Sequence, residues 1–71
     1  MLNVENKRLE EMLGDIETSL ASQNFDNYRN YLTQFRAEVT RVLPQFQRHD
    51  QGIVSNYWDK RLRLVIVKYG G

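Results

Sequence analysis

The sequence predicts an all-α fold: an antiparallel helical hairpin with a third, C-terminal helix packed on it. Two stretches carry apolar residues at alternating spacings of three and four, the pattern of helices packed along a seam. A polar, turn-rich cluster at residues 22–27 separates them, so the chain can fold back there. The predicted layers pair Leu20 with Tyr28, Ile16 with Leu32, Leu13 with Phe35, Leu9 with Val39, Asn6 with Val42, and Leu2 with Phe46.

The first helix is expected over about residues 3–21. Asn3 is the expected N-cap, because its side chain can accept from a free backbone N–H of the first turn. Glu5 then lies near the positive end of the helix dipole. Asn6 places an amide in the apolar seam, where it costs stability and specifies the pairing. The alternative is that its layer lies near a fraying helix end, where water satisfies the amide.

The second helix is expected over about residues 26–43, with Asn24 or Asp26 as its cap. Pro44 lacks a backbone N–H and clashes with the preceding turn, so it ends or kinks this helix. Phe46 continues the heptad beyond the proline, which favours a kink.

The third segment, about residues 53–69, fits two structures. As a strand, residues 61–69 are rich in β-branched side chains. A single strand has no partner within this chain, however, so the strand requires pairing between two chains. The helix is therefore the prediction, and an α+β fold with a C-terminal strand paired between chains is the alternative. In the helix, one face carries Val54, Trp58, Leu62, Val65 and Tyr69.

One flank of the predicted seam carries more charged residues than the other. Met12 and Tyr31 make the other flank less charged, and we expect the third segment to dock there. On the charged flank, opposite charges are expected to pair across the hairpin, Glu10 with Arg36 and Glu17 with Arg29.

Length and composition restrict what the chain can be. Its 71 residues form one small domain of marginal stability, residues 1–71. The sequence has no cysteine and a single histidine, which excludes disulfides and thiolate sites and argues against an ordinary zinc site. We therefore expect no metal and no cofactor, and stability from regular helix packing or from oligomerisation.

Neither a membrane segment nor a secretory signal is expected. The N-terminus is polar and charged, and the longest apolar run, Leu64 to Val67, is far shorter than the roughly 20 residues of a membrane span. The absence of cysteine fits a reducing compartment. We expect a cytoplasmic protein that does not enter membranes.

Catalytic constellations are weak in this sequence. His49 lies beside Arg48 and Asp50 in a polar stretch, where a solvated histidine is the ordinary interpretation. Glu10 and Glu11 are adjacent, so on a helix they point in different directions and do not form an acid–base pair. The sequence therefore predicts that the protein is not an enzyme.

The C-terminal segment is the candidate functional region. It carries more large apolar residues than one helix face can bury, and aromatic residues next to arginines are frequent interface anchors. We expect a non-catalytic protein–protein interaction module, such as an adaptor, small chaperone or regulator, that binds a protein partner or a second copy. The expected contact residues are Tyr57, Trp58, Arg61, Leu62, Arg63, Leu64 and Ile66.

The alternative function is nucleic-acid binding through the same segment. Residues 51–71 carry one acidic and four basic residues, whereas residues 1–24 carry five acidic and two basic ones. Basic side chains interleaved with aromatic ones can neutralise phosphates and stack on bases. The residues concerned are Tyr57, Trp58, Lys60, Arg61, Arg63 and Lys68.

Overall fold

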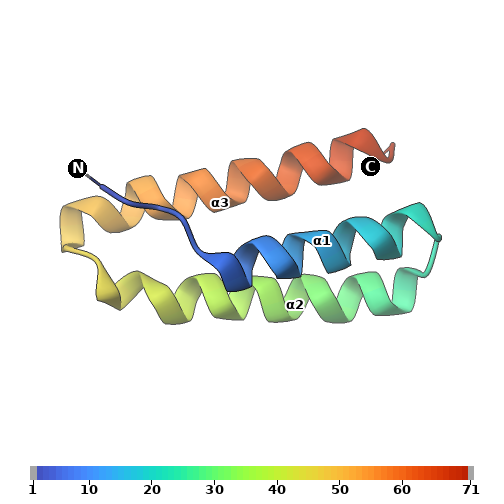
Figure 1. Cartoon of the computed structure of the whole chain (residues 1–71), viewed down its shortest axis with the longest axis horizontal. Coiled ribbons are helices and arrows are strands. Elements are labelled where there is room, and N and C mark those ends of the chain that lie inside the picture. Colours follow the sequence, from blue (N-terminus) through green and yellow to red (C-terminus); the bar gives the residue numbers. More distant parts are fainter. Residues whose placement is uncertain (1, 71) are drawn as a thin grey trace.

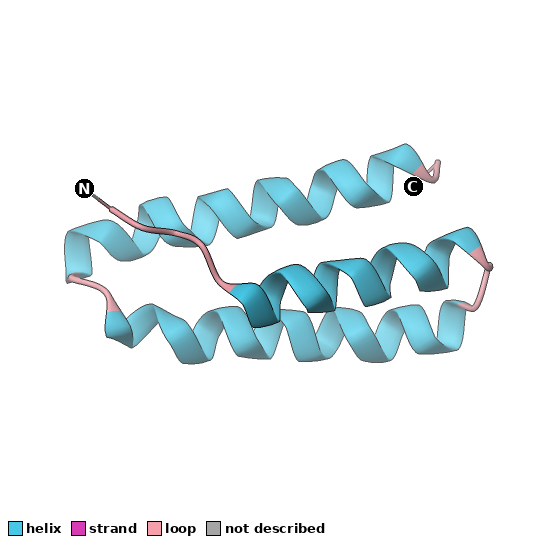
Figure 2. Ribbon diagram, in the orientation of Figure 1, coloured by secondary structure: helices cyan, strands magenta, loops and turns pink. Residues whose placement is uncertain are grey.

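The computed structural model describes residues 2–70 and shows three α-helices joined by short turns (Figure 1 and Figure 2). Residues 2–70 contain no strand, so the all-α prediction is confirmed and the C-terminal strand alternative is wrong. The elements are α1 (Lys7–Ala21), α2 (Phe25–Val42), a short 3-10 turn η1 (Leu43–Gln45) and α3 (Arg48–Lys68).

Helix α1 begins later than expected, because Asn6 rather than Asn3 caps it. The Asn6 side chain accepts a hydrogen bond of 3.0 Å from the backbone N–H of Leu9. The Asn3 side chain accepts instead from the N–H of Glu5, within the non-helical segment that precedes the helix. The polar residue in the apolar seam is therefore a helix cap, where its side chain satisfies a free N–H.

Helix α2 begins after Asn24, whose side chain accepts from the backbone N–H of Asn27 at 3.3 Å. At the other end, Pro44 lies inside η1, and Phe46 is already extended. The α-helix thus ends before the proline and tightens into a 3-10 turn, which suits a residue that has a fixed φ and no N–H to donate.

Helix α3 is longer than expected, because it begins at Arg48 and includes Gly52. Asp50 lies in its first turn, where a negative charge favours the positive end of the helix dipole. The β-branched residues near its C-terminus remain helical up to Lys68. Packing of one face of α3 against the hairpin therefore overrides their preference for strands.

The core lies where the three helices face one another. The predicted layer of Leu13 and Phe35 is buried, with 3% and 1% of each residue exposed, as the hairpin seam requires. Each helix contributes at least two residues to the buried apolar cluster: Leu9, Leu13, Ile16, Phe35, Val42, Val54, Trp58 and Leu62.

Helix α3 runs parallel to α1 and is joined to it by two ion pairs (Figure 1). The Arg61 guanidinium donates to both carboxylate oxygens of Glu10, at 2.6 and 2.8 Å. The Lys68 ammonium donates to Glu17 at 2.9 Å. Both pairs join residues 51 positions apart, one heptad from each other along both helices, so they set one parallel register.

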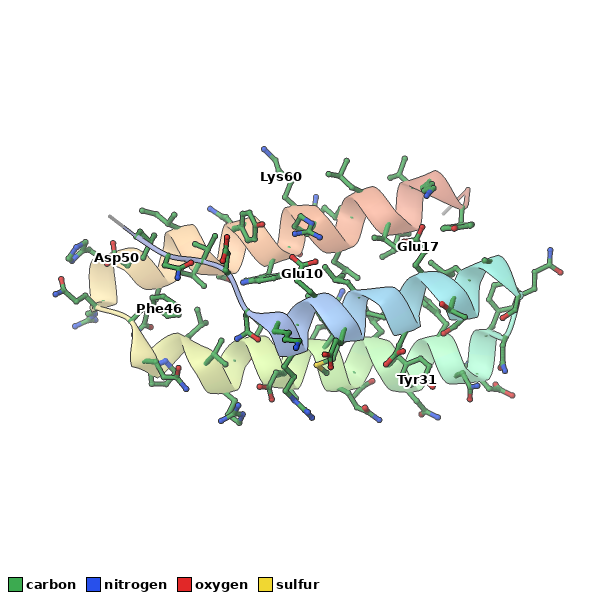
Figure 3. The ribbon with its side chains drawn as sticks, in the orientation of Figure 1. Glu10, Glu17, Tyr31, Phe46, Asp50 and Lys60 are labelled. Atoms are coloured by element: carbon green, nitrogen blue, oxygen red, sulfur yellow. The ribbon has the colours of Figure 1, made fainter. Side chains whose placement is uncertain are left out.

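Two predictions about the flanks of the hairpin are therefore wrong. Glu10 and Glu17 pair with α3, not with Arg36 and Arg29 of α2. Helix α3 docks on this charged flank, where Glu10 and Glu17 of α1 point towards α3 (Figure 3). The heptad spacing of the two glutamates also allows pairing with a parallel third helix. In the structure, Arg61 and Lys68 of that helix form these pairs.

Double-mutant cycles can separate the two pairings of Glu10. We expect charge reversal of Glu10 and of Arg61 to lose stability singly and to recover part of it when combined, with a coupling of under about 1 kcal/mol because both side chains are partly exposed. Glu10 combined with Arg36 is the matched control, and its effects should add. Chemical denaturation measures both cycles, and coupling to Arg36 instead of Arg61 would contradict this arrangement.

Candidate protein-binding surface

The expected contact residues occupy three different environments on α3. Two of them, Trp58 and Leu62, belong to the core, with 1% and 3% of their surface exposed. The Trp58 ring lies edge-on to Phe35 and to Tyr57, with ring centroids 6.3 and 5.0 Å away. These side chains hold α3 on the hairpin and present no surface to a partner of the folded domain.

Arg61 and Tyr57 lie at the edge of the contact between α3 and α1. The Arg61 guanidinium, besides binding Glu10, donates to the Tyr57 hydroxyl at 3.1 Å and lies over the Trp58 ring, 5.6 Å from its centroid. Hydrogen bonds to Glu10 and Tyr57 raise the pKa of Arg61, so it stays charged. Its charge is already matched within the fold.

The last three predicted residues lie towards the solvent to different degrees. Leu64 is exposed, whereas Ile66 is partly buried and packs against the core. Arg63 is exposed and lies 3.1 Å from Asp59 of the same helix. Of the seven predicted residues, Leu64 is therefore the apolar side chain most accessible to a partner.

The outward face of α3 carries a further set of exposed apolar residues. Ile53, Leu64 and Val67 expose 56, 63 and 68% of their surface. Lys60 is also exposed, lies between them in the sequence, and forms no ion pair within residues 2–70. We call Ile53, Lys60, Leu64 and Val67 the outer stripe.

Three members of the outer stripe were missing from the predicted contact residues. Ile53, Lys60 and Val67 follow one another at intervals of one heptad, and this spacing was readable in the sequence. This spacing identifies an outward face only when the inward face of the same helix is known. Val54 and Trp58 fix that face, and the outer stripe lies opposite to it.

A shallow hollow of about 360 Å³ lies between α2 and α3. Phe35 and Leu62 form part of its lining, but both are buried, so little apolar surface is accessible there. Arg36 and Arg63 also line it. The hollow offers mostly polar contacts, unlike the outer stripe.

His49 is the histidine considered above as a catalytic group. His49 lies in the first turn of α3, its Nε2 atom 3.4 Å from Asp50, with three quarters of its side chain exposed. The described residues hold no group of three metal-binding side chains. None of the helices described here combines the length and the apolarity that crossing a membrane requires.

The ion pairs between α1 and α3 also affect carboxylate protonation. Hydrogen bonds from Arg61 lower the pKa of the Glu10 carboxyl below its ordinary value. Hydrogen bonds from Lys68, and then from the hydroxyl of Tyr69, lower the pKa of Glu17. Each pair therefore favours the charged form of its glutamate in the folded chain.

Glu38 is the third carboxylate with a lowered pKa. It is nearly buried on α2, and the Arg41 guanidinium donates to both of its oxygens at 2.9 and 2.6 Å. Those hydrogen bonds are the main cause of the lowered pKa of Glu38. The charge of Arg8, whose Nε atom lies 3.7 Å from the carboxylate, lowers it further. The carboxylate is thus held by two arginines, Arg41 of the same helix and Arg8 of α1.

These shifts predict a loss of stability in acid. A carboxyl whose pKa is lower in the folded chain stabilises the fold above its unfolded pKa, about 4.3, and the effect is lost as the pH falls through the folded pKa. We expect the melting temperature to fall below about pH 4. Replacing Glu10, Glu17 and Glu38 by glutamine should flatten this fall, and an unchanged acid profile would contradict the pairing.

The geometry thus defines a three-helix, all-α domain with an exposed outer stripe on its C-terminal helix. Comparison of the chain with protein-family models, curated proteins and solved structures gives no match.

Proposed function

We propose that the protein is a non-catalytic protein-interaction module, an adaptor, small chaperone or regulator, which binds through the outer stripe of α3. The observation that carries this proposal is the exposure of three large apolar side chains, Ile53, Leu64 and Val67, on one helix face of a very small domain. Exposed apolar surface of this kind lowers the solubility of a small domain, and contact with another chain removes that surface from water. The absence of cysteine is compatible with work in a reducing, cytoplasmic compartment.

The charges of α3 favour this proposal over nucleic-acid binding. Arg61 and Lys68 are paired with glutamates of α1, and Arg63 lies beside Asp59. Trp58 is buried and cannot stack on a base in the folded domain. Most of the basic groups of α3 that would contact a phosphate backbone therefore already have an acidic neighbour. Titration with mixed DNA and RNA should therefore show no salt-sensitive binding.

A pair of serine substitutions tests the proposal. Leu64→Ser with Val67→Ser should abolish association with the protein that co-purifies with the tagged wild-type chain, while far-UV circular dichroism stays unchanged because both side chains are exposed. Ile66 is left intact, since it packs on the core. Native mass measurements compare the complexes.

The matched control is Phe25→Ser, which removes a similarly exposed apolar side chain from α2. This variant should keep the partner. A partner that stays bound to the double serine variant, or a wild-type chain that is monomeric and binds no protein, would overturn the proposal.

A further inference from the structure

The outer stripe has the geometry of a second helix-packing seam. Ile53, Lys60 and Val67 are spaced by one heptad each, and Leu64 fills the last interval at spacings of four and three. At 1.5 Å per residue the stripe is about 21 Å long, or four helical turns. Such a seam matches the side-chain ridge of one further helix.

Lys60 lies at the centre of this seam, at the position that is ordinarily apolar. A single lysine at a core position of a helix pair costs stability but determines which partner and register are allowed. Lys60 has no acidic partner within residues 2–70, whereas the neighbouring cations Arg61 and Arg63 are paired with Glu10 and Asp59. The ammonium is therefore available for a carboxylate from outside the chain.

Pairing with a second copy of α3 is unfavourable because of this lysine. An antiparallel pair that aligns Ile53 with Val67 places Lys60 opposite itself, and so does a parallel pair in register. A shift of one heptad leaves one end of the stripe beyond the facing helix. The other helices of a second copy do not fit either, since α1 exposes no large apolar residue and α2 exposes only Phe25.

We propose that the outer stripe binds a helix of another protein, one with an apolar heptad seam interrupted by a single acidic residue that faces Lys60. This inference rests on the proposed function and names the partner's chemistry. The apolar ends of the stripe contribute most of the buried area, and the ion pair at its centre fixes the register and excludes self-association.

Two synthetic peptides test this inference. Each is a helix of about three heptads with leucine at the seam positions, and the central seam residue is glutamate in one and lysine in the other. Wild-type protein should bind the glutamate peptide at least about tenfold more tightly, measured by fluorescence anisotropy. Lys60→Glu should reverse the preference, and Leu64→Ser with Val67→Ser should abolish binding of both.

A second measurement tests the exclusion of self-association. Lys60→Leu makes the seam wholly apolar and removes the like charges, so this variant should form dimers in native mass measurements while the wild-type chain stays monomeric. Equal affinity for the two peptides, no binding of either, a wild-type dimer or a monomeric Lys60→Leu variant would each overturn the inference. A natural partner that requires Leu64 and Val67 but tolerates Lys60→Glu would overturn it while leaving the proposed function intact.

Discussion

Replacing Trp58 by alanine is expected to remove a large fraction of the protein's free energy of unfolding. Trp58 is the largest fully buried side chain, and Phe35, Tyr57 and Arg61 all pack on its ring. Such a truncation costs about 3–5 kcal/mol through lost burial and the cavity that remains. A domain of this length has a total stability of only about 4–10 kcal/mol, so the loss is a large fraction of it.

Circular dichroism and urea denaturation measure this effect. The matched control is Phe25→Ala, which truncates an aromatic residue with 58% of its surface exposed. It should change the free energy of unfolding by no more than about 0.5 kcal/mol. A Trp58→Ala protein that is as stable as the control would mean that α3 is not packed on the hairpin as described.

Leu13→Ala is expected to have the second largest effect, a loss of about 2–5 kcal/mol. Leu13 is 3% exposed on α1 and belongs to the same buried cluster as Phe35 and Leu62, so its removal leaves a cavity that all three helices border. The control is Leu64→Ala, the same chemical change at an exposed site of α3.

The free energies of unfolding of the two leucine variants should differ by at least about 2 kcal/mol. If the two substitutions cost the same, the predicted seam between α1 and α2 is not the centre of the core. Since both variants lose the same atoms from a helix, the difference between them comes mainly from burial and from the cavity that remains.

The hairpin was predictable because its information is local and periodic. The alternation of three and four places Leu9, Leu13 and Ile16 on one face of α1, and the structure buries all three. The helical state of α3 was also predictable, although its apolar residues occur on more than one face and its C-terminal third is rich in β-branched residues. A lone strand without a partner is unfavourable whatever its composition.

The position of α3 was not predictable from the same pattern. Glu10 and Glu17 occupy a flank of the seam, and periodicity identifies that flank without identifying the helix that covers it. Arg36 of α2 and Arg61 of α3 are both chemically suitable partners for Glu10, and only the three-dimensional packing selects Arg61. Asn6 likewise fits an apolar seam by spacing but caps α1, because its own backbone is extended and the helix begins only at Lys7.

The candidate surface was predicted in its location and only partly in its residues. The C-terminal segment does carry the exposed apolar side chains, but Trp58 and Leu62 serve the core instead. An excess of apolar residues in one helix indicates that a second face, besides the one buried in the core, is also apolar. Assigning each residue to a face requires knowing where the hairpin lies, and therefore Ile53 and Val67 replace Trp58 and Leu62 on the outer stripe.

The most direct test of the division of α3 into an inner and an outer face is oxidative footprinting of the free chain and of its complex with the co-purifying protein. In the free chain, Leu64 and Val67 should be labelled and Trp58 should be protected, in accordance with their exposure. In the complex, Leu64 and Val67 should become protected while Trp58 stays unchanged. Labelling of Trp58 in the free chain, or equal labelling of Leu64 and Val67 in both states, would contradict a helix that folds through one face and binds through the other.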